Sequence, residues 1–425
     1  MSVALILFGS LVTGLAIGLP IAVAIGMSVL VSFYVVDLPL AAMAQRMYAS
    51  VNSFTLLAIP FFMLAGSLME VGGMSRRLVR FANSMVGTLA GGLAHVQVLA
   101  SCFFAALSGS SPATTAAIGS ALIPEMKKKG YPAEFSAAVQ SIAGTIGTII
   151  PPSIPMVVYG VVANESIGKL FAAGFIPGLI YGGSFMILIY FISKKRGYVS
   201  AEKFSSRECW DSFKEAIWAL LVPIIILGGI YSGIFTPTEA GAVAAVYGLL
   251  AGIFIYKELN FKNTMEVFAK SAVNTAMVLL IISASSAFSW IMTAKGVASL
   301  VGGWFAAMSG GPSMFLLLVI LLLLFMGCFM ETIASVLIVT PVLLPVAKSL
   351  GIDPILFGIV VTMTLSLGMS TPPVGENLYI AASIAGISFE QLLKNIWPFI
   401  IVAIFVILLI TFVPGISLFL PNIFY

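Results

Sequence analysis

The chain has 425 residues, of which 60% are hydrophobic and only 8% are charged. Soluble domains carry about 25% charged residues, so this composition excludes an ordinary soluble domain and predicts an all-α polytopic protein of the lipid bilayer. The net charge of +4 is small, and we expect no nucleic-acid partner. A single histidine and three scattered cysteines provide neither a metal cluster nor a catalytic constellation, so we do not expect an enzyme.

Apolar segments recur at the length of about 20 residues that a helix needs to cross a bilayer. In the first half the predicted spans cover residues 3–19, 20–36, 52–72, 134–163 and 168–193, with a hairpin at 92–126. In the second half they cover 216–234, 238–256, 270–294, 355–386 and 396–421, with a hairpin at 314–346. The sequence thus predicts two units, 1–193 and 216–425, joined by a polar linker over 194–215.

The two halves share the spacing of their prolines and glycines. A shift of 221 residues places Pro124 on Pro345, Gly147 on Gly368 and Pro151-Pro152 on Pro372-Pro373. Because proline and glycine fix unusual backbone geometry, the halves are expected to break their helices at matching places. Five crossings plus one re-entrant hairpin per half is an odd number of crossings, so the second repeat is expected to be inverted relative to the first.

The positive charges give the orientation. If the linker is cytoplasmic, sixteen of the 20 basic residues fall on cytoplasmic segments, and only Arg46, Lys169, Lys295 and Lys348 lie outside. This distribution obeys the positive-inside rule and predicts that both termini are periplasmic. Residues 73–86 and 296–308 precede the two hairpins, and they are either short interfacial helices or ordinary connecting loops.

Four polar breaks interrupt apolar sequence at residues 108–115, 143–152, 327–335 and 364–373. Non-helical backbone at membrane depth is tolerated only where it is buried in protein or lines a cavity, and paired broken helices mark the binding sites of secondary transporters. Small residues that let helices pack closely are the alternative interpretation, but they do not explain matching double prolines. Because hydroxyl and carbonyl oxygens dominate, Na⁺ is the expected coupling ion. Among the nearby acids, Glu239 is expected to cap a helix at 238.

The motifs resemble those of the large membrane subunit of TRAP (tripartite ATP-independent periplasmic) transporters, the DctM-type permeases. The segments that carry the resemblance span nearly the whole chain. They are Phe54–Phe62, Leu107–Ser111, Ile150–Pro155, Ala173–Gly178, Phe235–Ala240 and Thr371–Gly375.

The resemblance implies an elevator-type Na⁺ symporter of the bacterial inner membrane, importing a carboxylate such as a C4-dicarboxylate, sialic acid or another sugar or keto acid. It implies two partners, a periplasmic binding protein and a small four-helix membrane subunit on a separate chain. The implied Na⁺ ligands are Ser108, Ser110, Ser111, Gly144, Thr145, Gly327, Thr332, Gly368, Met369 and Thr371. The implied substrate contacts are Ser108, Ser111, Pro152, Glu331, Thr332 and Pro373. A stand-alone ion-coupled carrier or antiporter that needs no binding protein remains the alternative.

Overall fold

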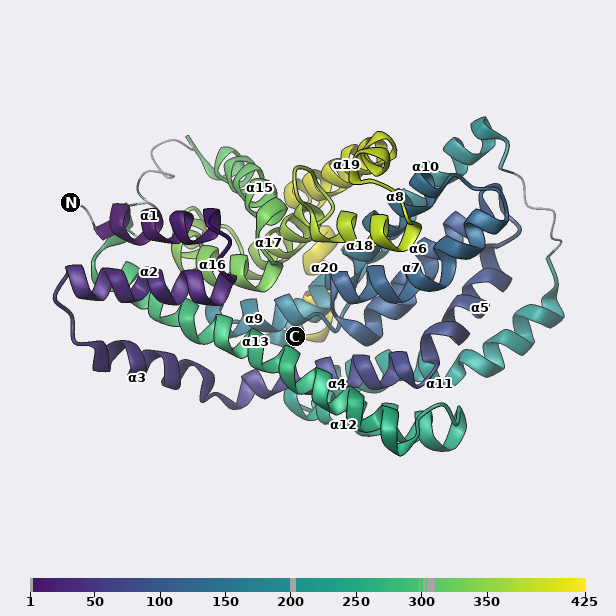
Figure 1. The fold of residues 1–425 in the computed structure, drawn as a ribbon, viewed down its shortest axis with the longest axis horizontal. Coiled ribbons are helices and arrows are strands. Elements are labelled where there is room, and N and C mark those ends of the chain that lie inside the picture. The colour runs from purple at the N-terminus through teal and green to yellow at the C-terminus, as the bar shows by residue number, and fades with distance from the viewer. Residues whose placement is uncertain (1–2, 199–203, 298, 301–302, 304–309) are drawn as a thin grey trace.

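The computed structural model describes residues 3–198, 204–297, 299–300, 303 and 310–425, and throughout these residues the regular structure is helical (Figure 1). The main helices of the first half are α1 (Val3–Ala16), α2 (Ile21–Val35), α3 (Leu40–Val51), α4 (Ala58–Val71), α5 (Met74–Val86), α6 (Gly92–Ser108), α7 (Ser111–Lys128), α8 (Ala133–Gly144), α9 (Ile154–Ala163) and α10 (Ile167–Arg196). Those of the second half are α11 (Ser206–Tyr231), α12 (Pro237–Leu250), α13 (Phe261–Ala294), α15 (Pro312–Phe329), α16 (Thr332–Ser349), α17 (Pro354–Gly368), α18 (Glu376–Ala385), α19 (Phe389–Phe412) and α20 (Gly415–Phe424).

Eight helical segments in the described part of the chain are long and apolar enough to cross a membrane. The longest is α13 with 34 residues, and the most hydrophobic are α15 and α19. Further apolar helices of 10–17 residues include α6, α9 and α17, which are shorter because the polar breaks end them. The architecture is that of a polytopic helical membrane protein.

The helix ends fall at the predicted breaks. In the hairpins, α6 ends at Ser108 and α7 begins at Ser111, and α15 ends at Phe329 before α16 begins at Thr332. In the broken helices, the α8–α9 interruption contains a short 3₁₀ turn over 145–148, and both interruptions contain a proline pair joined by a cis peptide bond.

Corresponding helices recur with the same shift of 221 residues. Helices α7 and α16 each have 18 residues, and their first residues are Ser111 and Thr332. Helix α13 corresponds to α3 and α4 together, which are separated near Asn52, whereas α13 continues through the equivalent position.

Three connections differ in detail from what the predicted spans imply. Residues 40–51, which lie between the predicted spans 20–36 and 52–72, form α3, an amphipathic helix without a buried residue. Helix α10 ends at Arg196 and helix α11 begins at Ser206, so residues 194–196 and 206–215 of the predicted 194–215 linker are helical, with Ser205 capping the first turn of α11. Helix α13 begins at residue 261 instead of 270, because Asn260 and Asn263 form a capping box that starts the helix early.

One local prediction is confirmed, and one choice that the sequence left open is decided. Thr236 and Glu239 form a capping box at the start of α12, with the Thr236 amide 2.8 Å from a Glu239 carboxylate oxygen. Residues 74–86 form α5, an amphipathic helix that carries Arg76, Arg77 and Arg80. Its predicted counterpart at 296–308 lies mostly outside the described residues.

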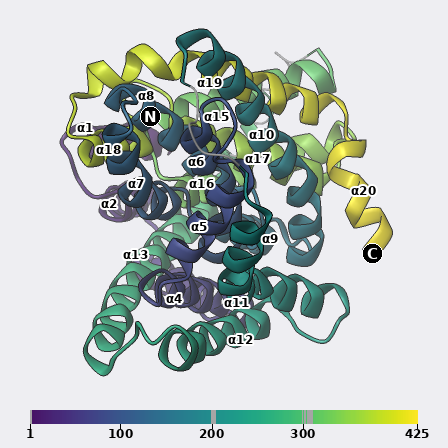
Figure 2. The same cartoon turned by 90° about the vertical axis from the view of Figure 1, so that its right-hand side faces the viewer.

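The helices form two parts. We call α1–α5 and α11–α13 the frame, in which α4 packs against α12 and α13, and α2 packs against α1 and α13. We call α6–α10 and α15–α20 the core, which contains both hairpins and both broken helices. The frame helices α4, α12 and α13 lie along one side of the molecule and the core lies above them in both views (Figures 1 and 2).

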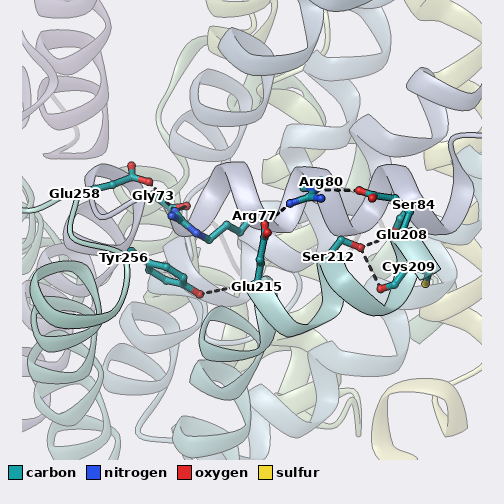
Figure 3. A network of polar contacts seen from close by, with 10 residues as sticks. All are labelled: Gly73, Arg77, Arg80, Ser84, Glu208, Cys209, Ser212, Glu215, Tyr256 and Glu258. Carbon is teal, nitrogen blue, oxygen red and sulfur yellow. Dashed lines mark hydrogen bonds and ion pairs between the residues drawn. The ribbon is translucent and has the colours of Figure 1, made fainter. Parts of the chain in front are cut away.

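Within the frame, charged side chains hold α5 to α11 and to the segment that follows α12 (Figure 3). Arg80 forms ion pairs with Glu208 and Glu215 of α11, at 3.0 and 2.5 Å. Arg77 pairs with Glu258 at 2.7 Å and lies over the ring of Tyr256. Since α5 connects α4 to the first hairpin, these contacts fix one end of the link between frame and core.

Candidate functional site

A cavity of about 460 Å³ lies between the frame and the core, within the range of about 300–1,000 Å³ that is typical of small-molecule sites. The core contributes both hairpin tips and residues at the starts of α9 and α18. The frame contributes one face of α4 and one face of α13. Both hairpin tips, both broken helices and two frame helices, which are far apart in the sequence, therefore meet at one place.

The first hairpin tip is built around Gly109 and Ser110. Gly109 adopts a positive φ of 60°, which a residue with a side chain rarely tolerates, and its carbonyl accepts a hydrogen bond from the Ile154 amide at 3.2 Å. Ser110 is the N-cap of α7, and the Ser108 hydroxyl lies 3.0 Å from that of Thr114. The tip is thus tied to the start of α9 and presents hydroxyl groups to the cavity.

The second hairpin tip has the same construction with a charged cap. Glu331 lies 221 residues after Ser110 and is the N-cap of α16, accepting hydrogen bonds from the amides of Ile333 and Ala334 at 2.9 and 3.2 Å. The Thr332 hydroxyl lies 3.0 Å from the Met369 sulfur, and the Gly375 amide donates to the Cys328 carbonyl. A carboxylate at a helix N-terminus interacts favourably with the helix dipole and with the free amides of the first turn, so Glu331 closes the start of α16 beside the cavity.

A network of uncharged polar groups joins the two halves of the core. The Asn377 amide nitrogen donates to the hydroxyls of Ser111 at 2.7 Å and Ser370 at 3.1 Å. Ser370 in turn donates to the Ser141 carbonyl at 2.8 Å. All four residues are fully buried, and the contacts connect the tip of the first hairpin to both broken helices.

A second branch of this network connects the two broken helices directly. The Ser366 hydroxyl donates to the Thr145 carbonyl at 2.9 Å, and the Thr148 hydroxyl donates to that of Ser366 at 2.6 Å. Thr148 also lines the cavity. The backbone carbonyls freed by the breaks are thus partly satisfied by hydroxyls from the other half, as buried polar groups require.

Glycines let the broken helices approach the hairpins. A Cβ atom added to Gly368 would lie 2.5 Å from the Gly327 Cα, and one added to Gly144 would meet the Thr115 side chain at 1.8 Å. A Cβ on Gly109 would lie 2.7 Å from the Pro152 carbonyl oxygen. These positions exclude any larger residue unless the backbone moves.

The predicted site residues fall into two groups. Ser108, Ser110, Ser111, Glu331, Thr332 and Met369 line the cavity. Gly144, Thr145, Pro152, Gly327, Gly368, Thr371 and Pro373 belong to the same breaks but are outside its described lining. Among them, the Thr145 and Thr371 hydroxyls donate to carbonyls of their own helices, at 2.6 and 2.8 Å. Which of these residues bind ion or solute stays a prediction.

The frame wall of the cavity was missed by the sequence analysis. It includes Glu70 on α4, and Ser271 and Asn274 on α13. In the sequence these residues lie in or at the ends of apolar runs. They could have been identified only if the face of each helix that meets the hairpins had been known. Asn377 was missed as well, although it directly follows Glu376 at the end of the second proline break.

Comparisons with known proteins give the family. The model of the family "Tripartite ATP-independent periplasmic transporter, DctM component" matches residues 8–416. The C4-dicarboxylate TRAP transporter large permease protein DctM of Rhodobacter capsulatus is 41% identical, over 99% of both chains. The isethionate TRAP transporter permease protein DctMQ of Oleidesulfovibrio alaskensis is 44% identical, over 97% of this chain and 66% of that protein.

A solved structure supports the fold. The crystal structure of the Alcanivorax borkumensis YdaH transporter has a TM-score of 0.57 at 14% sequence identity, over 89% of this chain and 86% of that one. The relatives above are named as permeases, in agreement with the prediction that the chain is not an enzyme. This chain belongs to the DctM family of TRAP transporter large permeases.

Proposed function

We propose that the chain is the large membrane subunit of a Na⁺-coupled symporter that imports an organic acid across the bacterial inner membrane, with both termini in the periplasm. A periplasmic binding protein delivers the solute, and a small four-helix membrane subunit on a separate chain completes the transporter. The proposed solutes are carboxylates such as C4-dicarboxylates, sialic acid, and other sugar or keto acids. The named substrates of the two relatives, a C4-dicarboxylate and isethionate, are both organic acids.

The observation that carries this proposal is the cavity at the meeting point of four interrupted helices. Its core side offers neutral oxygens from Ser108, Ser111, Thr148 and Thr332, together with backbone at the breaks. Neutral oxygens and half-helix ends are the groups with which transporters bind Na⁺ and anionic solutes at the midplane. The described residues contain no group of three or more His, Cys, Asp or Glu side chains placed to hold a metal ion, so a transition-metal site is not the model for this ion.

Movement of the core as one body against the frame is the proposed mechanism, an elevator built from two inverted repeats. The Asn377 and Ser366 contacts support this, because they join the hairpins and broken helices of both halves. The recurrence of helix bounds after 221 residues supports the repeat. The cavity also lies between frame and core, so a displacement of the core would carry a bound solute along the frame wall.

Transport by reconstituted protein tests the coupling. The permease, the small subunit and the binding protein are placed in proteoliposomes, and solute uptake is measured with a Na⁺ gradient, with a proton gradient alone, and without the binding protein. The proposal expects uptake only with Na⁺ and with all components present. Equal uptake on a proton gradient without Na⁺ would contradict the coupling, and uptake without the binding protein would favour a stand-alone carrier.

Two hydroxyl deletions test the ion site. Ser110→Ala and Thr371→Ala are each expected to raise the Na⁺ concentration for half-maximal uptake by about three- to tenfold, which corresponds to the roughly 0.5–1.5 kcal/mol of one hydrogen-bonding or ligand group. Ser120→Ala is the control, because Ser120 is an exposed residue of α7 whose hydroxyl only bonds its own helix. Unchanged Na⁺ dependence in both variants would rule out these two residues as ligands.

A further inference from the structure

The cavity is lined by acids from three different helices. Glu70 comes from α4 of the frame, Glu331 from the second hairpin tip and Glu376 from the first turn of α18. Among its described lining residues there is no lysine, arginine or histidine. Lys270 precedes the lining residue Ser271 and attracts Glu70, but it forms no ion pair within 4 Å.

The three carboxylates differ in their hydrogen-bond partners. Glu331 accepts hydrogen bonds from two backbone amides at the start of α16. Glu70 and Glu376 are exposed to the space they line, and neither makes a hydrogen bond or an ion pair with another described residue. Two carboxylates on opposite walls, one on the frame and one on the core, are therefore free to contact a bound solute.

An unpartnered hydroxyl lies beside them. Ser271 lines the cavity, is 4% exposed, and its oxygen has no hydrogen-bond partner in the described structure. A buried polar atom without a partner is destabilising, so such an atom in a residue of the cavity wall indicates that a ligand or water completes it. The frame wall thus combines the exposed carboxylate of Glu70 with the unsatisfied hydroxyl of Ser271.

Charge decides what kind of solute fits. Like charges close together in a site of low dielectric constant repel strongly, so a dianion would be repelled by each of these acids, and no basic residue among the described lining offsets that repulsion. A positively charged group of the solute would instead be attracted by each carboxylate. The acid group of the solute would then be left to the hairpin tips and the bound Na⁺.

The geometry points to a solute that carries an ammonium group as well as its acid group, held between Glu70 and Glu376. This inference rests on the proposed function and narrows its substrate class to ammonium-bearing carboxylates or sulfonates. It assigns the frame wall to the cationic end of the solute and the hairpin tips to the anionic end.

The experiment is a competition for uptake. Proteoliposomes containing the permease, the small subunit and the binding protein take up an equimolar mixture with and without Na⁺, and the accumulated solutes are identified by mass spectrometry. The mixture contains matched pairs that differ in ammonium or hydroxyl, β-alanine with 3-hydroxypropionate and taurine with isethionate. Glycine betaine, succinate and N-acetylneuraminate complete it.

We expect Na⁺-dependent accumulation of ammonium-bearing members only. Preferred accumulation of succinate, N-acetylneuraminate or a hydroxyl member would overturn the inference and leave the Na⁺ symport intact. If solutes accumulate equally with and without Na⁺, the proposed Na⁺ symport fails, and if no ammonium-bearing member accumulates, the inference fails.

Variants then test the two acids. Glu70→Gln and Glu376→Gln are each expected to raise the KM for the ammonium-bearing solute at least tenfold while kcat changes less than twofold. The KM for its hydroxyl analogue, where it is measurable, should not rise. Glu125→Gln is the control, because Glu125 pairs with Lys128 outside the cavity. An unchanged KM in both cavity variants would overturn the inference.

Discussion

The chain contains two polar networks that are built from different groups. In the core, Asn377, Ser111, Ser141 and Ser370 are fully buried and uncharged. In the frame, Arg80, Glu208 and Glu215 have side chains that are 44–49% exposed and that form ion pairs (Figure 3). Burying an ion costs several kcal/mol even after relaxation, whereas hydroxyls and amides can be satisfied by a few hydrogen bonds.

The difference indicates what each network does. The core network joins the hairpins and broken helices of both halves. It uses uncharged hydroxyl and amide groups, which cost less free energy than charges to bury at the depth of the membrane. The frame network lies where water reaches the charges, so each ion pair contributes little. The frame network acts by positioning α5, because it fixes α5 to α11 just before the chain enters the first hairpin.

Removing Asn377 should have the largest effect on stability. Asn377→Ala deletes three hydrogen bonds, to Ser111, Ser141 and Ser370. At about 0.6 kcal/mol for each interhelical bond in a membrane protein, and with buried acceptors left unsatisfied, we expect a loss of about 2–3 kcal/mol. Thermal unfolding of the purified protein in detergent measures this loss, and uptake should fall with it.

Asn395→Ala is the matched control for that variant. Asn395 accepts a hydrogen bond from Arg196 at 3.1 Å in an exposed position, so its removal should change the unfolding temperature little. Equal destabilisation by the two variants would show that the core network does not hold the two halves together.

An added methyl group at a helix break should have the next largest effect. In Gly368→Ala the new Cβ would lie 2.5 Å from the Gly327 backbone, and overpacking of this kind costs about 1–3 kcal/mol. Gly183→Ala is the control within α10, since nothing lies within 4 Å of its added Cβ. We expect Gly183→Ala to retain full uptake and Gly368→Ala to lose most of it, and equal uptake by both would contradict the close approach.

The breaks themselves were predictable because proline and glycine act locally. Pro151-Pro152 and Pro372-Pro373 cannot continue a regular helix, so their shared spacing predicted where α8 and α17 end. The capping box of Thr236 and Glu239 was predictable for the same reason, since its two members are three residues apart.

The cavity could be predicted only from its core side. Glu70 and Ser271 lie on helices whose sequence shows apolar residues on most faces, and the sequence does not say which face meets the hairpins. The contact of Ser141 with Ser370 joins residues 229 apart, and no local rule selects that pair. Helix α3 was missed for another reason, because its 12 residues are too few for a membrane span of about 20, although most of them favour a helix.

Neutralising the α5 clamp should have the smallest effect on stability. Arg80→Ala removes two half-exposed ion pairs, each contributing about 0.2–1 kcal/mol, and this contribution should shrink further in high salt because exposed charges are screened. The hydrogen bonds that Arg80 donates to Glu208 and Glu215 raise the pKa of Arg80, so Arg80 keeps its charge across the ordinary pH range and the variant should show no new pH dependence there. Thermal unfolding of the unmodified protein and of Arg80→Ala at 0.05 and 0.5 M NaCl measures this contribution. Arg76→Ala is the control, because the Arg76 side chain is 81% exposed and its contact with the Glu258 carboxylate is long, at 4.0 Å. If Arg80→Ala destabilises the protein as much as Asn377→Ala, the charged network contributes as much to stability as the buried one. The contrast drawn between the two networks would then be wrong.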